Sequence, residues 1–347
     1  MSRRSGGWPS WWLRRGFTAC ALLPLAGVFV AVSRARAWLW RHRWLRAWRA
    51  PVPVLVVGNV TAGGSGKTPL VACIADALRA AGWHPGIVSR GYRRRRDAAD
   101  PAPVHAHSAP ADVGDEPLLL RRACACPVWV GSRRAAAARG LLQAHPEVDV
   151  LLSDDGLQHF ALARDLQLVV LDARGAGNAW PLPAGPLRER ADRPRDATLG
   201  PPAAAGASPA PFFALRRGIG ELRNLADSRR LGIAQFLAAR AGRPVSAAAA
   251  IGNPAQFFDM LRQAGVPLAA TLQARDHEAL PAAQLRELPG DVLLTEKDAL
   301  KCELGPPHLD RLWAVQLRLE VDPDFVPWLL ARLQRAAWSS HDGFTSA

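Results

Sequence analysis

Apolar runs of strand length alternate with stretches of helical periodicity along most of the chain. Residues 52–59 (VPVLVVGN) form a continuous apolar, β-rich run, which is typical of a buried strand. Residues 68–82 place apolar side chains at helical spacing and end at a glycine. Further strand-like runs lie at 85–90, 127–131, 148–155 and 166–172, with a helical stretch at 133–144. This alternation predicts an α/β fold with a doubly wound, mostly parallel sheet.

A Pro- and Ala-rich stretch at residues 201–211 interrupts this pattern and predicts a linker. Beyond it, further strands are expected near 211–216, 245–251, 291–295 and 312–319, and a last helix at about 323–337. We therefore predict four parts. An N-terminal segment (1–49) precedes a core domain (50–205) and a smaller α/β domain (206–320), and a C-terminal helix (321–347) packs on the core.

The loop between the first strand and the first helix, NVTAGGSGKTP at 59–69, resembles a phosphate-binding loop. It differs from G-x-x-x-x-G-K-[ST] because Thr61 stands where the first glycine is usual. The order strand, glycine-rich loop, helix is nevertheless the context that a P-loop requires. Lys67 would then reach the terminal phosphates of ATP and the Thr68 hydroxyl would ligate Mg²⁺. The backbone N–H groups that would surround the phosphates belong to Thr61, Ala62, Gly63, Gly64, Ser65, Gly66, Lys67 and Thr68.

Two acids end the run VDVLLSDD at 148–155. A buried parallel strand brings Asp154 and Asp155 to the carboxyl edge of the sheet, beside the loop after the first strand. One of them can hold the metal ion that bridges the phosphates. Alone, Asp-Asp-Gly is more often a turn, and the upstream P-loop reverses that preference. The sequence leaves open which carboxylate is the direct ligand.

The positive charge is concentrated at the N-terminus. Residues 1–50 hold ten arginines and no acid, which leaves about +4 of the net +14 for the rest of the chain. The basic block surrounds the uncharged run 17–33 and includes seven of the 13 tryptophans. This pattern disfavours a nucleic-acid partner and indicates a membrane surface. A helix that lies in the interface is favoured over a short membrane span and over a signal peptide that ends near ARA at 35–37.

Residue counts add two indications. The five cysteines have no zinc-site spacing and suggest reduced thiols in the cytosol. Only three of the 44 basic residues are lysines, so the lysine at position 67 suggests a role that an arginine cannot fill.

A series of motifs in the chain resembles the tetraacyldisaccharide 4′-kinase family, from about residue 17 to about residue 320. Thr61 in place of the first glycine and Pro69 after Thr68 are traits of that family. The motifs occur in the order VGNVTAGGSGKTP, SRGY, VGDEP, SDDGLQH, LPAGPLRE, IGNP, DH and LLTEKDALK.

The resemblance implies transfer of the γ-phosphate of ATP to the 4′-hydroxyl of a tetraacylated glucosamine disaccharide 1-phosphate. This reaction gives lipid IVA in the lipid A pathway of Gram-negative bacteria. The acceptor is a lipid of the inner membrane, so the cytoplasmic leaflet is an expected partner. A soluble P-loop kinase for another small acceptor and a membrane-tethered NTPase switch are the alternatives.

The resemblance also implies roles for individual residues. Asp115 and His277 match the acid and the histidine that activate the acceptor hydroxyl. Asp154 and Asp155 match the acids on the metal side. Further candidates are Glu189 for the metal, Gln158 and His159 near the phosphates, and Tyr92 and Arg188 for substrate contacts. The chain departs from the family pattern at residues 247–250 (AAAA) and at Glu278. The assignment of His277 is therefore less specific than that of the phosphate loop.

Overall fold

The computed structural model describes residues 8–63, 66–95, 98–207, 210–276, 278–302, 304–305 and 308–342. The chain forms two compact units. The larger unit consists of residues 9–216 and 321–347, and the smaller one consists mainly of residues 217–320. Each unit is described in turn.

The larger unit is built on a parallel sheet. Its strands occur in the order β8-β7-β6-β1-β5-β2-β4-β3, and among them only the short β3 is seen to pair antiparallel, with β4. This arrangement confirms the predicted doubly wound α/β fold. The strands are β1 (Val54–Gly58), β2 (Pro85–Ser89), β3 (Ala102–Pro103), β4 (Val128–Val130), β5 (Val150–Asp154), β6 (Leu166–Val170), β7 (Ala197–Gly200) and the start of β8 (Phe212–Asn224).

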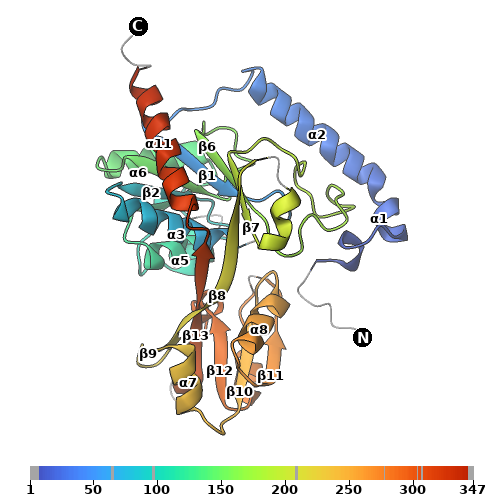
Figure 1. Ribbon diagram of the computed structural model, residues 1–347, viewed down its shortest axis with the longest axis vertical. Helices are drawn as coiled ribbons and strands as arrows, with labels where there is room; N and C mark the ends of the chain where they lie inside the picture. Colours follow the sequence, from blue (N-terminus) through green and yellow to red (C-terminus); the bar gives the residue numbers. More distant parts are fainter. Residues whose placement is uncertain are drawn as a thin grey trace. The chain divides into compact units, whose positions relative to one another are not determined.

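Helices cover this sheet and explain the apolar run of β1. Val54 and Val56 belong to one core cluster with Ala137 and Leu141 of α6 (Arg134–Ala144). Leu55 lies between them in the strand, so it faces the opposite side of the sheet, and it is also fully buried. β1 is therefore buried on both faces. α3 contacts β1, β2 and β5 and also packs against α5 and α11 (Figure 1). The helices are α3 (Lys67–Ala80), α4 (Pro110–Val113), α5 (Asp115–Ala123), α6 (Arg134–Ala144) and α11 (Phe325–Asp342).

The smaller unit is also α/β. Its strands β10, β11, β12 and β13 follow the order β11-β10-β12-β13, with parallel pairing, and β13 neighbours β8. Phe236 and Trp313 pack edge to face in its core. Its elements are β9 (Arg230–Leu231), α7 (Ile233–Ala239), β10 (Val245–Ala249), α8 (Pro254–Gln263), β11 (Leu268–Gln273), α9 (Ala282–Glu287), β12 (Asp291–Thr295), α10 (Glu296–Ala299), the 3₁₀ helix His308–Arg311 and β13 (Leu312–Val321).

The chain passes between the units along β8 and β13. The transition lies at 216/217 and 320/321, so the first boundary falls inside a strand and not at 205/206. The stretch expected to be a linker contains a 3₁₀ helix, Pro202–Ala207, within the larger unit. α11 returns to the larger unit, where Phe325 and Trp328 contact the ring of Phe213.

The N-terminal segment consists of a 3₁₀ helix (Ser10–Trp12), α1 (Phe17–Ala21) and α2 (Leu23–Arg41). Its first turn binds the loop at 178–187: Trp12 Nε1 donates to the Pro183 carbonyl at 3.0 Å, and Asn178 Nδ2 donates to the Trp11 carbonyl at 2.8 Å. In the described part of the chain, no helix has the length and apolar character needed to cross a membrane. Exposed large apolar side chains are nevertheless concentrated here: Leu13, Phe17, Leu23, Leu25, Val28, Val32, Trp38, Trp44 and Leu45.

Candidate active site

The candidate site lies where β1 and β5 end. The two strands are parallel neighbours, and Val57 pairs with Asp154. The loop after β1 and the acids after β5 therefore leave the sheet at the same edge, where ligands of open α/β sheets bind. The adjacency expected from the sequence is present.

The glycine-rich loop enters α3 through a left-handed residue. Gly66 has φ +71° and precedes Lys67, the first residue of the helix. Asn59, which is buried directly after β1, holds the loop from inside: its Nδ2 lies 3.4 Å from Thr61 Oγ1 and 3.3 Å from the Gly63 carbonyl. Gly64 and Ser65, two of the predicted phosphate-binding residues, lie outside the described residues.

A second segment supports the loop from the other side. The Ala62 amide donates to the Pro186 carbonyl and the Arg188 amide donates to the Val60 carbonyl, each at 2.8 Å. Thr61 and Leu187 form an antiparallel bridge. The motif LPAGPLRE thus contacts the phosphate loop directly through its backbone.

Lys67 connects the two halves of the site. Its Nζ lies 3.4 Å from Asp155 Oδ1 and 3.4 Å from Asn59 Oδ1. The Lys67 side chain is only 11% exposed. A partly buried ammonium ion between the ends of β1 and β5 is placed to neutralise a phosphate bound to the loop.

Asp154 and Asp155 have different surroundings. Asp154 is 1% exposed, and its Oδ2 accepts a hydrogen bond from Ser89 Oγ at 3.2 Å. Its Oδ1 is buried and has no hydrogen-bond partner among the described residues. Burial, together with the negative charges of Glu116 and Asp155, raises the pKa of Asp154 to about 7.

Asp155 is already paired. Besides Lys67, it faces Arg188 Nη1, which lies 3.4 Å from its Oδ2. Burial opposes ionisation, but these two cations outweigh it and lower the pKa of Asp155. The left-handed backbone of Asp155, with φ +49°, turns the chain immediately after β5. Asp155 is therefore the carboxylate that is paired with two cations.

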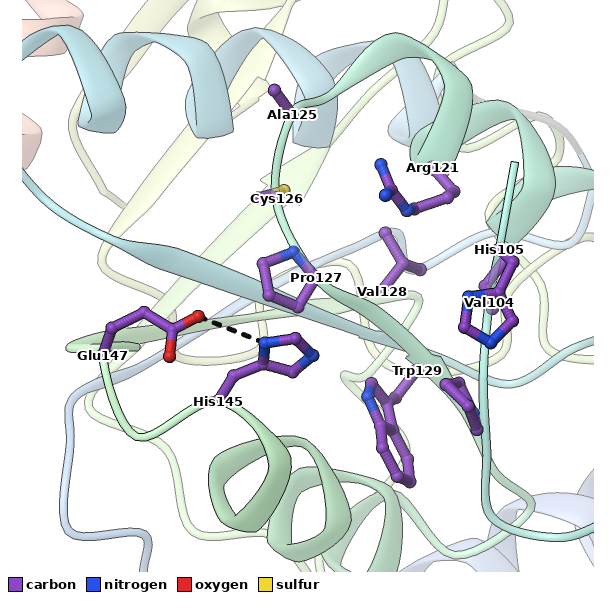
Figure 2. Close-up of a pocket in the computed structure, with 11 residues that line it drawn as sticks. Val104, His105, Arg121, Ala125, Cys126, Pro127, Val128, Trp129, His145 and Glu147 are labelled. Carbon is purple, nitrogen blue, oxygen red and sulfur yellow. Dashed lines mark hydrogen bonds and ion pairs between the residues drawn. The ribbon is translucent and has the colours of Figure 1, made fainter.

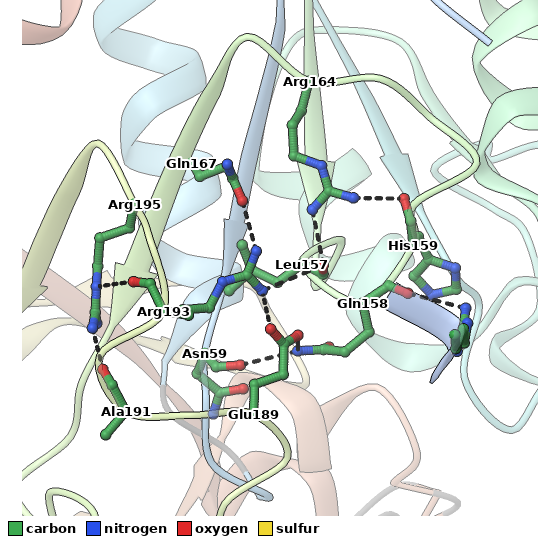
Figure 3. Close-up of polar contacts among 11 residues, drawn as sticks. Asn59, Leu157, Gln158, His159, Arg164, Gln167, Glu189, Ala191, Arg193 and Arg195 are labelled. Carbon is green, nitrogen blue, oxygen red and sulfur yellow. Dashed lines mark hydrogen bonds and ion pairs between the residues drawn. The ribbon is translucent and has the colours of Figure 1, made fainter. Parts of the chain in front are cut away.

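Gln158 and Glu189 form a hydrogen-bonded pair beside the loop. Gln158 Nε2 donates to Glu189 Oε1 at 2.8 Å and lies 3.4 Å from the Asn59 carbonyl (Figure 3). Arg193 Nη1 binds Glu189 Oε2 at 2.5 Å, and its Nη2 donates to Gln167 Oε1 at 2.7 Å. Both oxygens of Glu189 thus have protein partners. In the described ranges, no three or more His, Cys, Asp or Glu side chains form a group that could hold a metal. The metal role of Glu189 stays a prediction.

His159 follows Gln158 and stays neutral near pH 7. Burial, with Arg134 and Arg90 nearby, lowers the pKa of His159 to about 4. Arg164 Nη2 donates to the His159 carbonyl at 2.9 Å, which fixes the backbone of this loop.

The motifs SRGY and VGDEP meet through two glycines. Gly91 has φ +67° and Gly114 has φ +91°, and a Cβ on Gly114 would lie 3.0 Å from the Gly91 Cα. Asp115, the first residue of α5, is 9% exposed, whereas Tyr92 is half exposed. The close backbone contact places the segment that carries Asp115 next to the segment that carries Tyr92.

His277 lies outside the described residues. Its sequence neighbour Asp276 belongs to the smaller unit and forms an ion pair with Lys297 at 2.9 Å. Asp115 belongs to the larger unit. The predicted Asp115–His277 pair therefore remains a prediction.

Three residues of the site were not singled out from the sequence: Asn59, Arg134 and Arg193. Asn59 follows the first strand, and a polar residue between a buried strand and a glycine-rich loop is a usable signal. Arg134 is 1% exposed, and its Nη1 donates to the Gly131 carbonyl at 2.8 Å while Nη2 lies 3.4 Å from the Asp154 carbonyl. Nothing in the sequence distinguishes Arg134 and Arg193 from the many surface arginines.

A separate hollow of about 360 Å³ lies near the amino ends of β4 and β5 (Figure 2). His145 and Glu147 lie on one side of it, with 3.1 Å between His145 Nδ1 and Glu147 Oε1. Trp129 and Arg121 also line it. Because phosphate groups bind at the carboxyl ends of such strands, this hollow is distinct from the candidate site.

A parallel sheet with a lysine-bearing phosphate loop after β1 and acids after the adjacent strand defines a P-loop phosphotransferase. The family model for tetraacyldisaccharide-1-P 4′-kinases matches residues 18–334, and the chain belongs to that family.

Individual proteins that resemble this chain belong to the same family. The tetraacyldisaccharide 4′-kinase of Bordetella parapertussis is 46% identical over 350 residues, with 95% of this chain and 94% of the relative covered. That of Janthinobacterium sp. (strain Marseille) is 43% identical over 331 residues, with 93% and 94% covered. The crystal structure of the "apo" form of LpxK from Aquifex aeolicus in complex with ATP matches with a TM-score of 0.73 and 26% identity, and it covers 91% of this chain and 99% of that one.

Proposed function

We propose that the chain transfers the γ-phosphate of ATP to the 4′-hydroxyl of a tetraacylated glucosamine disaccharide 1-phosphate, giving ADP and lipid IVA. Family membership and the likeness to an ATP-complexed relative support this reaction. The structural observation that carries it is the position of Lys67 Nζ, between Asn59 and Asp155 at the ends of β1 and β5. The soluble-kinase and switch alternatives receive no support from the relatives.

Lys67 would act on the phosphate side of the reaction. Its charge offsets the negative charge that spreads over the transferring phosphoryl group. The ion pair with Asp155 and the hydrogen bond to Asn59 hold the ammonium in place before the nucleotide binds. Little reorganisation is then needed at the moment of transfer.

We assign Mg²⁺ to Asp154 and Thr68. The buried Oδ1 of Asp154 has no hydrogen-bond partner among the described residues, and an oxygen ligand of this kind is what Mg²⁺ prefers. Two protein ligands are sufficient because phosphate oxygens and water complete the coordination in P-loop enzymes. When bound, the ion would supply positive charge that offsets the negative charge of the phosphates.

Asp115 and His277 would act on the acceptor. A sugar hydroxyl is a poor nucleophile at neutral pH, and a histidine oriented by a carboxylate can take its proton as the new P–O bond forms. Asp115 starts α5 in a nearly buried position, which suits a residue that orients a partner. Tyr92 and Arg188 are candidates for contacts with the acceptor lipid.

We further propose that the enzyme works on the cytoplasmic face of the inner membrane, held there by residues 8–45. Support comes from the exposed apolar side chains on this segment, including Phe17, Leu25, Val28 and Val32, which are between 59% and 90% exposed. The ten arginines of residues 1–50 would favour anionic lipid headgroups. A lipid acceptor and an enzyme on the same surface meet at high effective concentration.

The direct test is an incubation of the purified chain with ATP, Mg²⁺ and the tetraacylated disaccharide 1-phosphate in mixed micelles. We expect the lipid to gain one phosphate, located at the 4′ position by mass spectrometry. Asp154→Asn should need more Mg²⁺ for half-maximal activity, whereas a surface control, Asp259→Asn, should not. ATP consumption without a phosphorylated lipid would reject the proposed reaction.

A further inference from the structure

Arg36, on the N-terminal helix α2, contacts the loop that follows Asp154 and Asp155. Its Nη2 donates to the Gln158 carbonyl at 3.1 Å. Its guanidinium also lies over the Phe160 ring, 5.8 Å from the centroid. Arg36 and Gln158 are 122 positions apart in the sequence, so this contact exists only in the folded chain.

Another arginine, Arg164, binds the two carbonyl groups on either side of the Gln158 carbonyl. Arg164 Nη1 donates to the Leu157 carbonyl at 2.8 Å, and Arg164 Nη2 donates to the His159 carbonyl at 2.9 Å (Figure 3). Three consecutive carbonyl oxygens, at 157, 158 and 159, thus accept from guanidinium groups. The middle one is the one that depends on α2.

Gln158 carries this contact to the phosphate loop. Its side-chain Nε2 lies 3.4 Å from the Asn59 carbonyl, and the Asn59 Oδ1 lies 3.4 Å from Lys67 Nζ. Gln158 also binds Glu189 at 2.8 Å. Three hydrogen bonds, linked by the covalent structure of Gln158 and of Asn59, therefore connect α2 with Lys67.

We propose that Arg36 is a positioning residue that couples α2, the helix with the exposed apolar face, to the phosphate-binding loop through Gln158. Residues on α2 that are placed to enter a lipid surface and the residue that orients Gln158 share one helix. When α2 lies on the membrane, the loop at 157–159 is held in the geometry that aligns Asn59 and Lys67. This inference rests on the proposed function, in which Lys67 binds the transferring phosphate.

The kinetic test compares Arg36→Ala with Arg41→Ala and Arg36→Lys, using enzyme fully bound to phosphatidylethanolamine/phosphatidylglycerol vesicles that contain the acceptor. Both alanine variants remove one positive charge from α2, so their vesicle binding should weaken equally. Only Arg36→Ala should lower kcat, by about 3- to 10-fold, the size expected for one ordinary hydrogen bond at a solvent-exposed position. Its KM for ATP should change less than about twofold, on the order of experimental error. Lysine can also donate to a carbonyl, so Arg36→Lys should recover most of kcat.

A double-mutant cycle tests the route through Gln158. In a Gln158→Ala background, the further loss caused by Arg36→Ala should nearly vanish, because residues that act through one another are not additive. Equal kcat for Arg36→Ala and Arg41→Ala, or fully additive losses in the cycle, would overturn the proposal.

Hydrogen exchange provides a readout that does not require turnover. The His159 amide, which donates to the Gly156 carbonyl at 2.9 Å, reports on the loop. In vesicle-bound protein, its exchange should be faster in Arg36→Ala than in wild type and Arg41→Ala. If the wild type makes no phosphorylated lipid but this difference appears, the proposed reaction fails and the coupling stands. Unchanged exchange in Arg36→Ala rejects the coupling, whatever the activity.

Discussion

Asp154 and Asp155 are adjacent in the sequence, yet their surroundings separate their roles. Asp155 is neutralised by Lys67 and Arg188, each 3.4 Å away, whereas Asp154 has a buried oxygen with no hydrogen-bond partner among the described residues. Because two cations face Asp155, we propose Asp154 as the metal ligand of the pair. The difference arises at the end of β5. Asp154 is the last residue of the strand, whereas Asp155 has a left-handed backbone that turns the chain away from it.

Lys67→Ala tests the phosphate side of the site. We expect kcat to fall by roughly 10²–10³-fold, the loss typical for a preorganised group that stabilises transition-state charge. The fold should survive, because alanine is a good helix former at the start of α3. Lys301→Ala removes a lysine from the other unit and serves as the control in the same steady-state assay. A Lys67→Ala enzyme with kcat near that of this control would refute the P-loop assignment.

At the scale of elements, α2 is unusual because its large apolar residues face outward. Val28 and Val32, one helical turn apart, are 61% and 62% exposed. Burial of such side chains in a lipid interface is worth about 1.5–3 kcal/mol each, so a few of them suffice for peripheral binding.

Val32→Glu should therefore weaken vesicle binding about tenfold or more, as measured by sedimentation with anionic vesicles. Ala35→Glu, also on α2 and exposed, adds the same charge without removing a large apolar group and should have a smaller effect. Both variants should keep the wild-type melting temperature, since neither position is buried. Equal losses of binding would show that charge, and not apolar contact, governs docking.

The junction of Gly91 and Gly114 gives a second prediction at this scale. Gly114→Ala should destabilise the protein and reduce activity, because the new Cβ would lie 3.0 Å from backbone that cannot move away easily. Gly82→Ala is the matched control, since Gly82 also has a positive φ of +86°, but a Cβ added there would meet no other atom within 4 Å. The control variant bears only the left-handed strain of about 1–2 kcal/mol. Chemical denaturation compares the two variants, and equal losses would contradict the predicted clash.

At the scale of the whole molecule, the proposed acceptor residues come from different units. Asp115 belongs to the larger unit, and the segment of the chain that contains His277 belongs to the smaller one. If they act on one proton transfer, the two units must cooperate in every turnover.

Asp115→Ala and His277→Ala should each lower kcat by about 10²–10⁴-fold while changing KM for ATP much less. The double variant should be little worse than the poorer single variant, because the two residues would serve one step. Steady-state kinetics of the three variants test this, with Asp276→Ala as the control for the neighbouring carboxylate. Fully additive losses, or ordinary kcat in His277→Ala, would place the base elsewhere.

Much of the fold and of the site could be read from local patterns. The strand–loop–helix unit around Lys67, the acids after β5 and most strands were predicted, because each depends on residues close in sequence. β11 was missed because its six residues alternate between exposed and half-buried positions and carry no strong apolar signal. β8 is one continuous strand whose residues belong to both units, so no local pattern in the sequence marks the point where the chain passes from one unit to the other.

The sequence by itself determined the chemistry of this protein: a lysine, a hydroxyl and two carboxylates in the order of a P-loop kinase, and a basic, Trp-rich N-terminus. Only the tertiary structure decided how these groups are held. Three hydrogen bonds join residues that are distant in the chain: Arg36 to Gln158, Ala62 to Pro186, and Arg193 to Gln167. No sequence pattern distinguishes Arg36 or Arg193 from the other basic residues, of which the chain has 44 in all. Periodicity and motifs report on neighbours along the chain, whereas these hydrogen bonds depend on which strands lie side by side in the folded sheet.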